Sequence, residues 1–138
     1  MGFSRRDMIA RGAALSLAPL LGTATAQAHT HSPSMIIPPR LRKGDTIGLV
    51  SPASSNFDSF DYDLADDVVT ALGLVPKRGK HVGQDFGYFS APDKDRAADV
   101  NAMFADKSVN GIMAIRGGWG CARILPYLDF EMIAKNPK

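Results

Sequence analysis

The most informative part of the sequence is Gly111-Ile112-Met113-Ala114-Ile115-Arg116-Gly117-Gly118-Trp119-Gly120-Cys121-Ala122-Arg123, a short apolar run that ends in a glycine-dense turn. An apolar run of this length, bounded by turn residues, is typical of a buried strand. A turn at the carboxyl end of a strand in an α/β protein is where ligands and oxyanions usually bind. The stretch therefore predicts a buried strand followed by a ligand-binding turn.

The rest of the chain predicts strands and helices in alternation. We expect strands at residues 46–50, 74–77 and 112–115, helices at residues 61–72 and 92–105, a short helix from Ala122 and a last turn capped by Asp129. Because the strands are too apolar to leave one face in water, this order predicts an α/β fold, a parallel sheet with helices on both faces. Pro76 indicates that the second strand lies at an edge of the sheet or that the strand ends there.

Helical spacing indicates which face each longer helix should bury. In the first helix the expected face consists of Ala65, Val68, Val69 and Leu72, and Gly73 ends the helix. In the second helix it consists of Ala97, Val100, Asn101 and Phe104.

Two turns are expected to face each other across one cleft. Ser51-Pro52-Ala53-Ser54 follows the first strand, and residues 117–120 follow the third, so both lie at carboxyl ends of parallel strands. The Gly117-Gly118 segment is expected to donate N–H groups to an oxyanion, because glycine lets a substrate approach the backbone closely. The alternative is a tight turn that binds nothing.

The other candidate motifs for binding or catalysis match their patterns less well than the glycine turn does. Gly118 to Arg123 resembles the dinucleotide-binding fingerprint but has arginine where that motif needs a small residue. Cys121 as a nucleophile lacks small residues two places away on each side and has no histidine nearby in sequence. His29 and His31 have a spacing that suits copper, and His81 is expected to be exposed in a loop. No complete set of nucleophile, base and acid is present, and no metal or cofactor is predicted.

The N-terminus has the pattern of an export signal. Ser4-Arg5-Arg6-Asp7-Met8-Ile9 precedes an apolar run at 12–22 and a small-residue cleavage site at Ala26-Gln27-Ala28. The paired arginines resemble a twin-arginine signal, so residues 1–28 predict an exported, periplasmic protein that meets the export machinery, with a linker at residues 29–40. The alternatives are an ordinary signal peptide and an uncleaved anchor, for which the run is short.

The charge balance and the single cysteine exclude some classes of function. The net charge of +2 belongs to the signal, because the basic and acidic residues of 29–138 balance. Without a basic stripe or basic–aromatic interleaving, no nucleic-acid partner is predicted. Cys121 alone forms no internal disulfide.

From Leu41 to Lys138 the chain resembles the N-terminal part of the L,D-carboxypeptidase family, the serine peptidases that include muramoyltetrapeptide carboxypeptidase and the microcin C immunity peptidase. The segments that carry the resemblance are Leu41-Arg42-Lys43-Gly44-Asp45, Leu49-Val50-Ser51-Pro52-Ala53-Ser54, residues 95–106, residues 115–129 and Asn136-Pro137-Lys138. Trp119 stands where the family usually has tyrosine.

The resemblance implies a flavodoxin-like domain and cleavage of an L-to-D peptide bond that releases D-alanine from murein tetrapeptide, by Ser-Glu-His catalysis without a metal. It puts the nucleophile in a Gly-x-Ser-Asp turn beyond Lys138, and the glutamate and histidine in a C-terminal domain, so no catalytic residue is assigned here. It implies that Gly117 and Gly118 help to form the oxyanion hole. The other implied site residues are Arg116 and Trp119, which shape the pocket, and Ser51 and Ser54, which line the cleft.

The chain is accordingly expected to be a truncated N-terminal piece that is inactive alone, with murein peptide as the substrate of the whole enzyme. Homodimerisation of the full-length form is left open. The alternative function is a non-enzymatic periplasmic module that binds a peptide or sugar in the same cleft and cuts nothing.

Overall fold

The computed structural model describes residues 36–55 and 58–138. The chain divides into two compact units, Met1–Ser34 and Met35–Lys138, and every described residue belongs to the second. The predicted export signal, His29 and His31 lie outside the described residues. The elements in order are β1 (Thr46–Val50), α2 (Phe60–Ala71), β2 (Val75–Arg78), α3 (Asp93–Ala105), β3 (Val109–Ala114), α4 (Gly120–Ile124), the 3-10 helix η1 (Leu125–Tyr127) and α5 (Phe130–Lys135). The predicted alternation of strands and helices is confirmed, but the third strand begins at Val109 rather than at Ile112, and within it only Val109 and Gly111 are buried.

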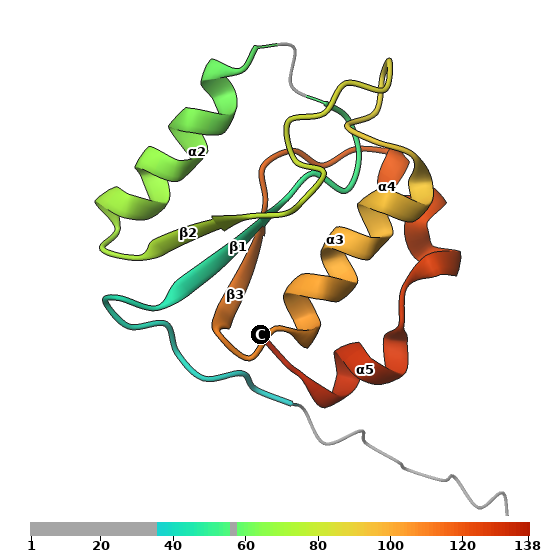
Figure 1. The fold of residues 1–138 in the computed structure, drawn as a ribbon. Helices are drawn as coiled ribbons and strands as arrows, with labels where there is room; N and C mark the ends of the chain where they lie inside the picture. The colour runs from blue at the N-terminus through green and yellow to red at the C-terminus, as the bar shows by residue number, and fades with distance from the viewer. Residues whose placement is uncertain (1–35, 56–57) are drawn as a thin grey trace, which may run out of the picture. The chain divides into compact units, whose positions relative to one another are not determined.

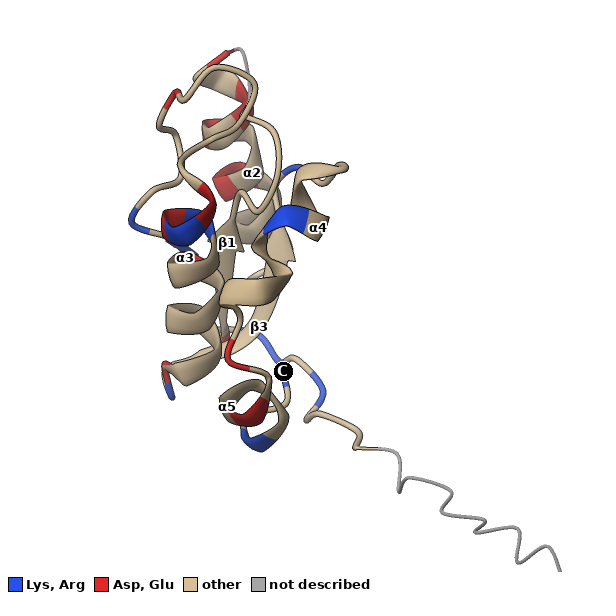
Figure 2. Ribbon diagram, turned by 90° about the vertical axis from the view of Figure 1, so that its right-hand side faces the viewer, with Lys and Arg blue, Asp and Glu red and all other residues tan. Residues whose placement is uncertain are grey.

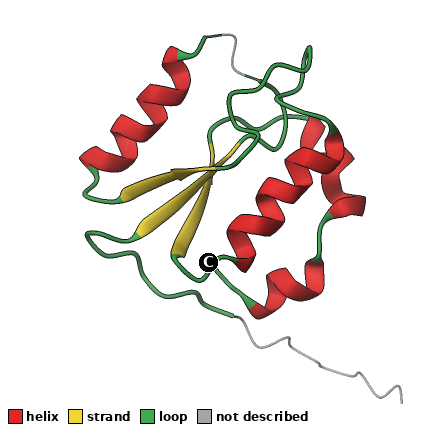
Figure 3. Cartoon of the chain, viewed as in Figure 1, coloured by secondary structure: helices red, strands yellow, loops and turns green. Residues whose placement is uncertain are grey.

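The three strands form one parallel sheet in the order β2-β1-β3 (Figures 1 and 3). Pro76 lies in β2, an edge strand, as its missing N–H requires. The chain passes from β1 to β2 on one side and then returns across β1 to β3 on the other. This reversal puts the carboxyl ends of β1 and β3 at a topological switch point, where α/β sheets bind ligands.

Helices cover both faces of the sheet, as predicted (Figure 1). Ile47 and Leu49 of β1 pack with Val69 of α2 on one face. On the other face Val50 packs with Met103 of α3, in one cluster with Val109. None of the helices in the described part of the chain has the length and apolar character that crossing a bilayer needs.

The buried faces of the helices differ in part from those predicted. In α2 Val69 is buried, but Val68 and Leu72 are 47% and 70% exposed, because no described element covers that side. In α3 Ala97 is buried, whereas Phe104 is only half-buried and Met103 takes the core position. The same helix buries two charged residues, Arg96 and Asp99, because its first half packs against polar loops rather than against a strand.

The helix ends follow the sequence closely. Gly73 has φ +77° and donates its N–H to the carbonyl of Thr70, which ends α2 as predicted. The side chain of Asp129 accepts the N–H of Met132 at 2.9 Å, so the predicted cap of α5 is confirmed.

Candidate active site

The structure brings the two predicted turns into contact at the carboxyl edge of the sheet. The Oγ of Ser54, after β1, donates to the carbonyl oxygen of Gly117, after β3, at 3.4 Å. A Cβ added to Gly118 would lie 3.6 Å from the Cβ of Ala53. Contact this close fixes the glycine turn against the end of β1.

The glycine turn keeps backbone donors unused. Gly118 has φ +146°, in the left-handed region that favours glycine, and a Cβ added to Gly117 would meet nothing within 4 Å. Residues 117–119 are exposed. Within residues 36–55 and 58–138, the N–H groups of Gly117 and Gly118 have no hydrogen-bond acceptor. Unused N–H groups on an exposed turn are what stabilisation of an oxyanion requires.

The two predicted serines are buried behind this turn and are not part of its exposed surface. Ser51 is 5% exposed and Ser54 is 7% exposed. The hydroxyl of Ser51 has no hydrogen-bond partner among the described residues, while its carbonyl accepts the Oγ of Ser90 at 2.6 Å. Neither hydroxyl is therefore presented as an accessible nucleophile.

Arg116 and Trp119 flank the turn but contact different parts of the protein. Arg116 is exposed, makes no ion pair with any described residue, and lines a cavity of about 460 Å³ with Asp61 and Leu64 of α2. Trp119 is 60% exposed and stacks on Tyr88, with ring centroids 5.5 Å apart and planes at 20°. The turn is thus flanked by a cation beside α2 and by an aromatic pair at the loop before α3.

A group that the sequence did not mark holds this region together. Arg96 is 1% exposed, and its guanidinium donates to the carbonyl of Pro52, in the turn after β1, and to the carbonyl of Gly120, at the end of the glycine turn. Arginine is seldom buried, so neither composition nor helical spacing indicates this position. Only its place inside the family-like segment 95–106 pointed to it. Tyr88 and Phe89, which pack against Trp119, also carry no signal in the sequence that marks them as site residues.

Asp93 links Arg96 to a second arginine. Asp93 accepts from Arg96 and from the Nε of Arg123, the latter at 3.0 Å. The hydrogen bond from Arg123 is the main cause that holds the pKa of Asp93 below its usual 3.8. In Figure 2 the first turn of α3 carries both acidic and basic residues, and α4 carries a basic one. The carboxylate is therefore ionised at neutral pH and neutralises part of this cationic cluster.

His81 is not exposed, so that expectation was wrong. Its Nδ1 lies 2.9 Å from Oδ1 of Asp99, its N–H donates to Oδ2, and the two side chains are 16% and 6% exposed. A Cβ at Gly79 would lie 2.6 Å from the same carboxylate, so the loop after β2 needs glycine there. The pair fastens this loop to α3.

Cys121 closes the glycine turn through its backbone rather than through its thiol. It is half-buried, and its N–H donates to the carbonyl of Gly118 at 3.1 Å. The described residues contain no group of three or more side chains able to hold a metal ion.

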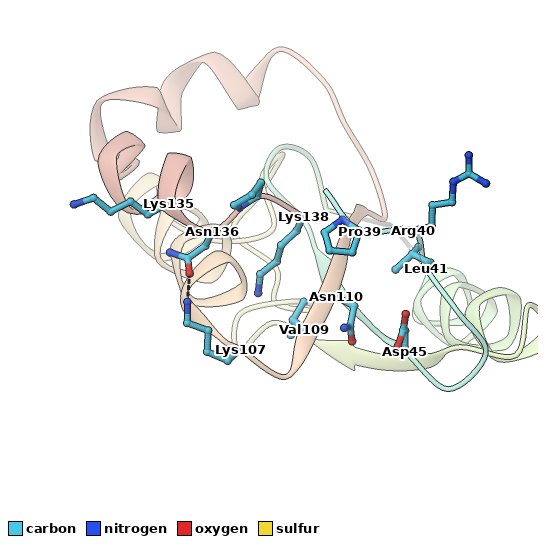
Figure 4. A pocket seen from close by; sticks show the side chains of 11 residues that line it. Pro39, Arg40, Leu41, Asp45, Lys107, Val109, Asn110, Lys135, Asn136 and Lys138 are labelled. Atoms are coloured by element: carbon cyan, nitrogen blue, oxygen red, sulfur yellow. Dashed lines mark hydrogen bonds between the residues drawn. The ribbon is translucent and has the colours of Figure 1, made fainter. Parts of the chain in front are cut away.

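A separate cavity of about 340 Å³ lies at the opposite, amino edge of the sheet (Figure 4). Two of its cations are already engaged: Lys107 donates to the side chain of Asn136, and Lys138 donates to the carbonyls of Met103 and Asp106 at the end of α3. Burial lowers the pKa of Lys138. This arrangement caps a helix and is remote from the glycine turn.

The family follows from comparison with known proteins. Residues 47–138 match the model of the LD-carboxypeptidase N-terminal domain. The chain belongs to the LD-carboxypeptidase family. This confirms the resemblance read from the sequence, and the matched region contains the glycine turn and most of the sheet.

Members of the family are similar in sequence and in fold. A probable murein peptide carboxypeptidase of Bacillus subtilis is 40% identical over 101 residues, which are 73% of this chain and 31% of that protein. The structure of an MccF-like protein from Bacillus anthracis has a TM-score of 0.70 at 30% identity, over 75% of this chain and 32% of that one. Muramoyltetrapeptide carboxypeptidase from Oxalobacter formigenes has a TM-score of 0.60 at 28% identity, over 67% and 31%. This chain spans about a third of the length of these proteins.

Proposed function

We propose that this protein is a serine L,D-carboxypeptidase that releases the terminal D-alanine of murein tetrapeptide. Family membership supplies the class of reaction, peptide-bond hydrolysis at a carboxyl terminus. The murein substrate is supported by relatives named as murein peptide and murein tetrapeptide carboxypeptidases.

The observation that carries the proposal is the exposed peptide of Gly117 and Gly118. Attack on a peptide carbonyl converts its oxygen into an oxyanion, and N–H groups already aimed at that oxygen stabilise the transition state. The turn lies at the switch point of the sheet, and its two donors have no acceptor among the described residues. We assign the turn one side of the oxyanion hole.

The flanking residues suit a substrate that ends in a carboxylate. Arg116 adjoins the turn and is unpaired within the described part of the chain, so its guanidinium is available for the terminal carboxylate. Trp119 offers an apolar ring on the side of Tyr88. Ser51 and Ser54 would line the cleft from behind, at the end of β1.

The nucleophile is proposed from the resemblance alone. It belongs to a Gly-x-Ser-Asp turn that follows the next strand of a flavodoxin-like sheet, and the glutamate and histidine belong to a C-terminal domain. Without these groups the oxyanion turn has nothing to stabilise. We therefore expect residues 1–138 alone to hydrolyse no murein peptide.

We propose export to the periplasm through a twin-arginine signal at residues 1–28. Twin-arginine transport depends on the arginine pair, so Arg5→Lys with Arg6→Lys is expected to retain a fused reporter in the cytoplasm. Export of that variant at the wild-type level would contradict this route.

The test of the reaction compares residues 1–138 with the longest product that the gene encodes. Each is incubated with murein tetrapeptide, and free D-alanine and tripeptide are measured by mass spectrometry. We expect D-alanine from the long product only. Saturable binding without cleavage by both would instead support the binding module, and cleavage by the short chain that Cys121→Ala abolishes would indicate a cysteine hydrolase.

A further inference from the structure

Arg96 joins the loops at the carboxyl edge of the sheet from inside the protein. Its Nη1 donates to the carbonyl of Pro52, after β1, and to the carbonyl of Gly120 at 3.1 Å. Its Nε donates to the carbonyl of Ala91 at 2.8 Å, before α3. One side chain therefore connects the loops that follow β1, β2 and β3.

The environment of Arg96 is built to hold a guanidinium. Its Nη2 pairs with Asp93, and its Cζ lies 4.6 Å from the ring centroid of Phe89. A buried guanidinium is costly unless its donors are satisfied, and here Nε, Nη1 and Nη2 all have acceptors. The planar fork of arginine reaches several acceptors at once, which a lysine ammonium on a flexible stem does not reproduce.

The contact with Gly120 fixes the position of the glycine turn. Gly120 has no room to move inward, because a Cβ there would lie 2.7 Å from the ring of Phe89 and 3.1 Å from the Cα of Ala53. Gly118 is two residues away, and its carbonyl is held by the N–H of Cys121 at 3.1 Å. A shift of the Gly120 carbonyl would therefore displace the N–H groups of Gly117 and Gly118.

We propose that Arg96 is a positioning residue, which sets the separation between the end of β1 and the glycine turn and thereby aims the turn's N–H groups. This inference rests on the proposed function for its catalytic meaning. Arg96 itself touches no substrate, because its side chain is buried behind the turn. A displacement of about 1 Å at an oxyanion site costs on the order of 100-fold in rate.

Arg123 provides a matched control. It shares the carboxylate of Asp93 and lies 5.2 Å from the same Phe89 ring. In contrast to Arg96, its side chain is 50% exposed and donates to no carbonyl of the described loops. If the ion pair or the aromatic contact were what positions the turn, Arg96→Lys and Arg123→Lys should have similar effects. If the hydrogen bonds to the loop carbonyls position it, only Arg96→Lys should release the turn.

The first test measures amide hydrogen exchange in the 138-residue chain. We expect Arg96→Lys to accelerate exchange at residues 117–121 by about tenfold or more, while the amides of β1 and β3 keep their protection. Arg123→Lys should leave both regions unchanged. Asp93→Asn, which keeps Arg96 but removes its ion pair, should give a smaller acceleration at the same residues. The proposal would be overturned if both Arg96→Lys and Asp93→Asn left exchange in the turn unchanged. It would also be overturned if both variants lost as much protection in β1 as in the turn.

The second test measures kcat and KM for murein tetrapeptide in the longest gene product. Arg96→Lys is expected to lower kcat by about 100-fold with KM changed by less than about threefold, because the loss falls on the transition state. Arg123→Lys should keep both constants. A rise in KM alone would contradict the positioning role. If the wild-type product released no D-alanine, the proposed function would fail, whereas the exchange result would still decide whether Arg96 holds the turn.

Discussion

The hydroxyl of Ser54 donates to the carbonyl of Gly117 at 3.4 Å and so ties the end of β1 to the end of β3 across the site. Its neighbour in the same turn, Ser51, is equally buried, yet its hydroxyl has no partner within the described residues. Two similar serines thus make opposite contributions, because one satisfies a carbonyl of the glycine turn and the other leaves a buried polar atom unpaired.

Alanine substitutions should separate these two serines. We expect Ser54→Ala to lower the free energy of unfolding by about 1 kcal/mol, the net value of one hydrogen bond. Ser51→Ala should be neutral or stabilising, because it removes an unsatisfied hydroxyl. Urea unfolding of both variants measures the difference, and a larger loss for Ser51→Ala would show that its hydroxyl has a role that the structure does not account for.

A methyl group at Gly120 should push the turn away from β1. A Cβ there would lie 3.1 Å from the Cα of Ala53, a backbone atom that cannot rotate aside. Overpacking of this kind costs about 1–3 kcal/mol, so Gly120→Ala should lower the free energy of unfolding by that amount. Gly117→Ala, where an added Cβ meets nothing within 4 Å, is the control. Equal stability of the two variants would contradict the packing.

Stability should fall in acid partly through Asp106. A hydrogen bond from Lys77 is the main cause that holds the pKa of Asp106 well below its usual 3.8. A carboxyl whose pKa is lower in the folded state adds stability that is fully present above the unfolded pKa and is lost as the pH falls below it. The urea midpoint should therefore drop below about pH 4, and less steeply in Asp106→Asn and in Lys77→Met. Identical acid profiles for all three proteins would contradict this linkage.

The exposed apolar side of α2 and the free edge of β3 should make the 138-residue chain associate. Leu64, Val68 and Leu72 are 47%, 47% and 70% exposed, and β3 has a partner on one side only among the described strands. Exposed strand edges beside apolar surface favour association. Sedimentation velocity should show oligomers that Val68→Lys reduces. A monomer with a sharp thermal transition would contradict the expectation.

The local signals in the sequence predicted the elements well. The strand at 46–50, the end of the first helix at Gly73 and the cap at Asp129 were all correct, because each depends on a few neighbouring residues. The meeting of the turns after β1 and β3 also followed, since the carboxyl ends of parallel strands share one edge of a sheet.

Local sequence signals did not predict which polar side chains are buried at the site. Arg96 and Asp99 are buried by loops that approach from elsewhere in the chain, and helical spacing carries no information about those loops. The divergence of Arg116 and Trp119 depends on their contacts with α2 and Tyr88, which are likewise distant in sequence.

The most direct test is the rate of D-alanine release from murein tetrapeptide by the longest gene product carrying Gly118→Ala. Gly118 has φ +146°, so a side chain strains the turn and misdirects its N–H groups. Gly44→Ala is the control, because Gly44 also has a positive φ, +89°, but precedes β1 at the amino edge of the sheet. We predict that Gly118→Ala lowers kcat by about 100-fold or more while Gly44→Ala keeps it. Equal kcat values for the two variants would contradict an oxyanion-binding role for the glycine turn.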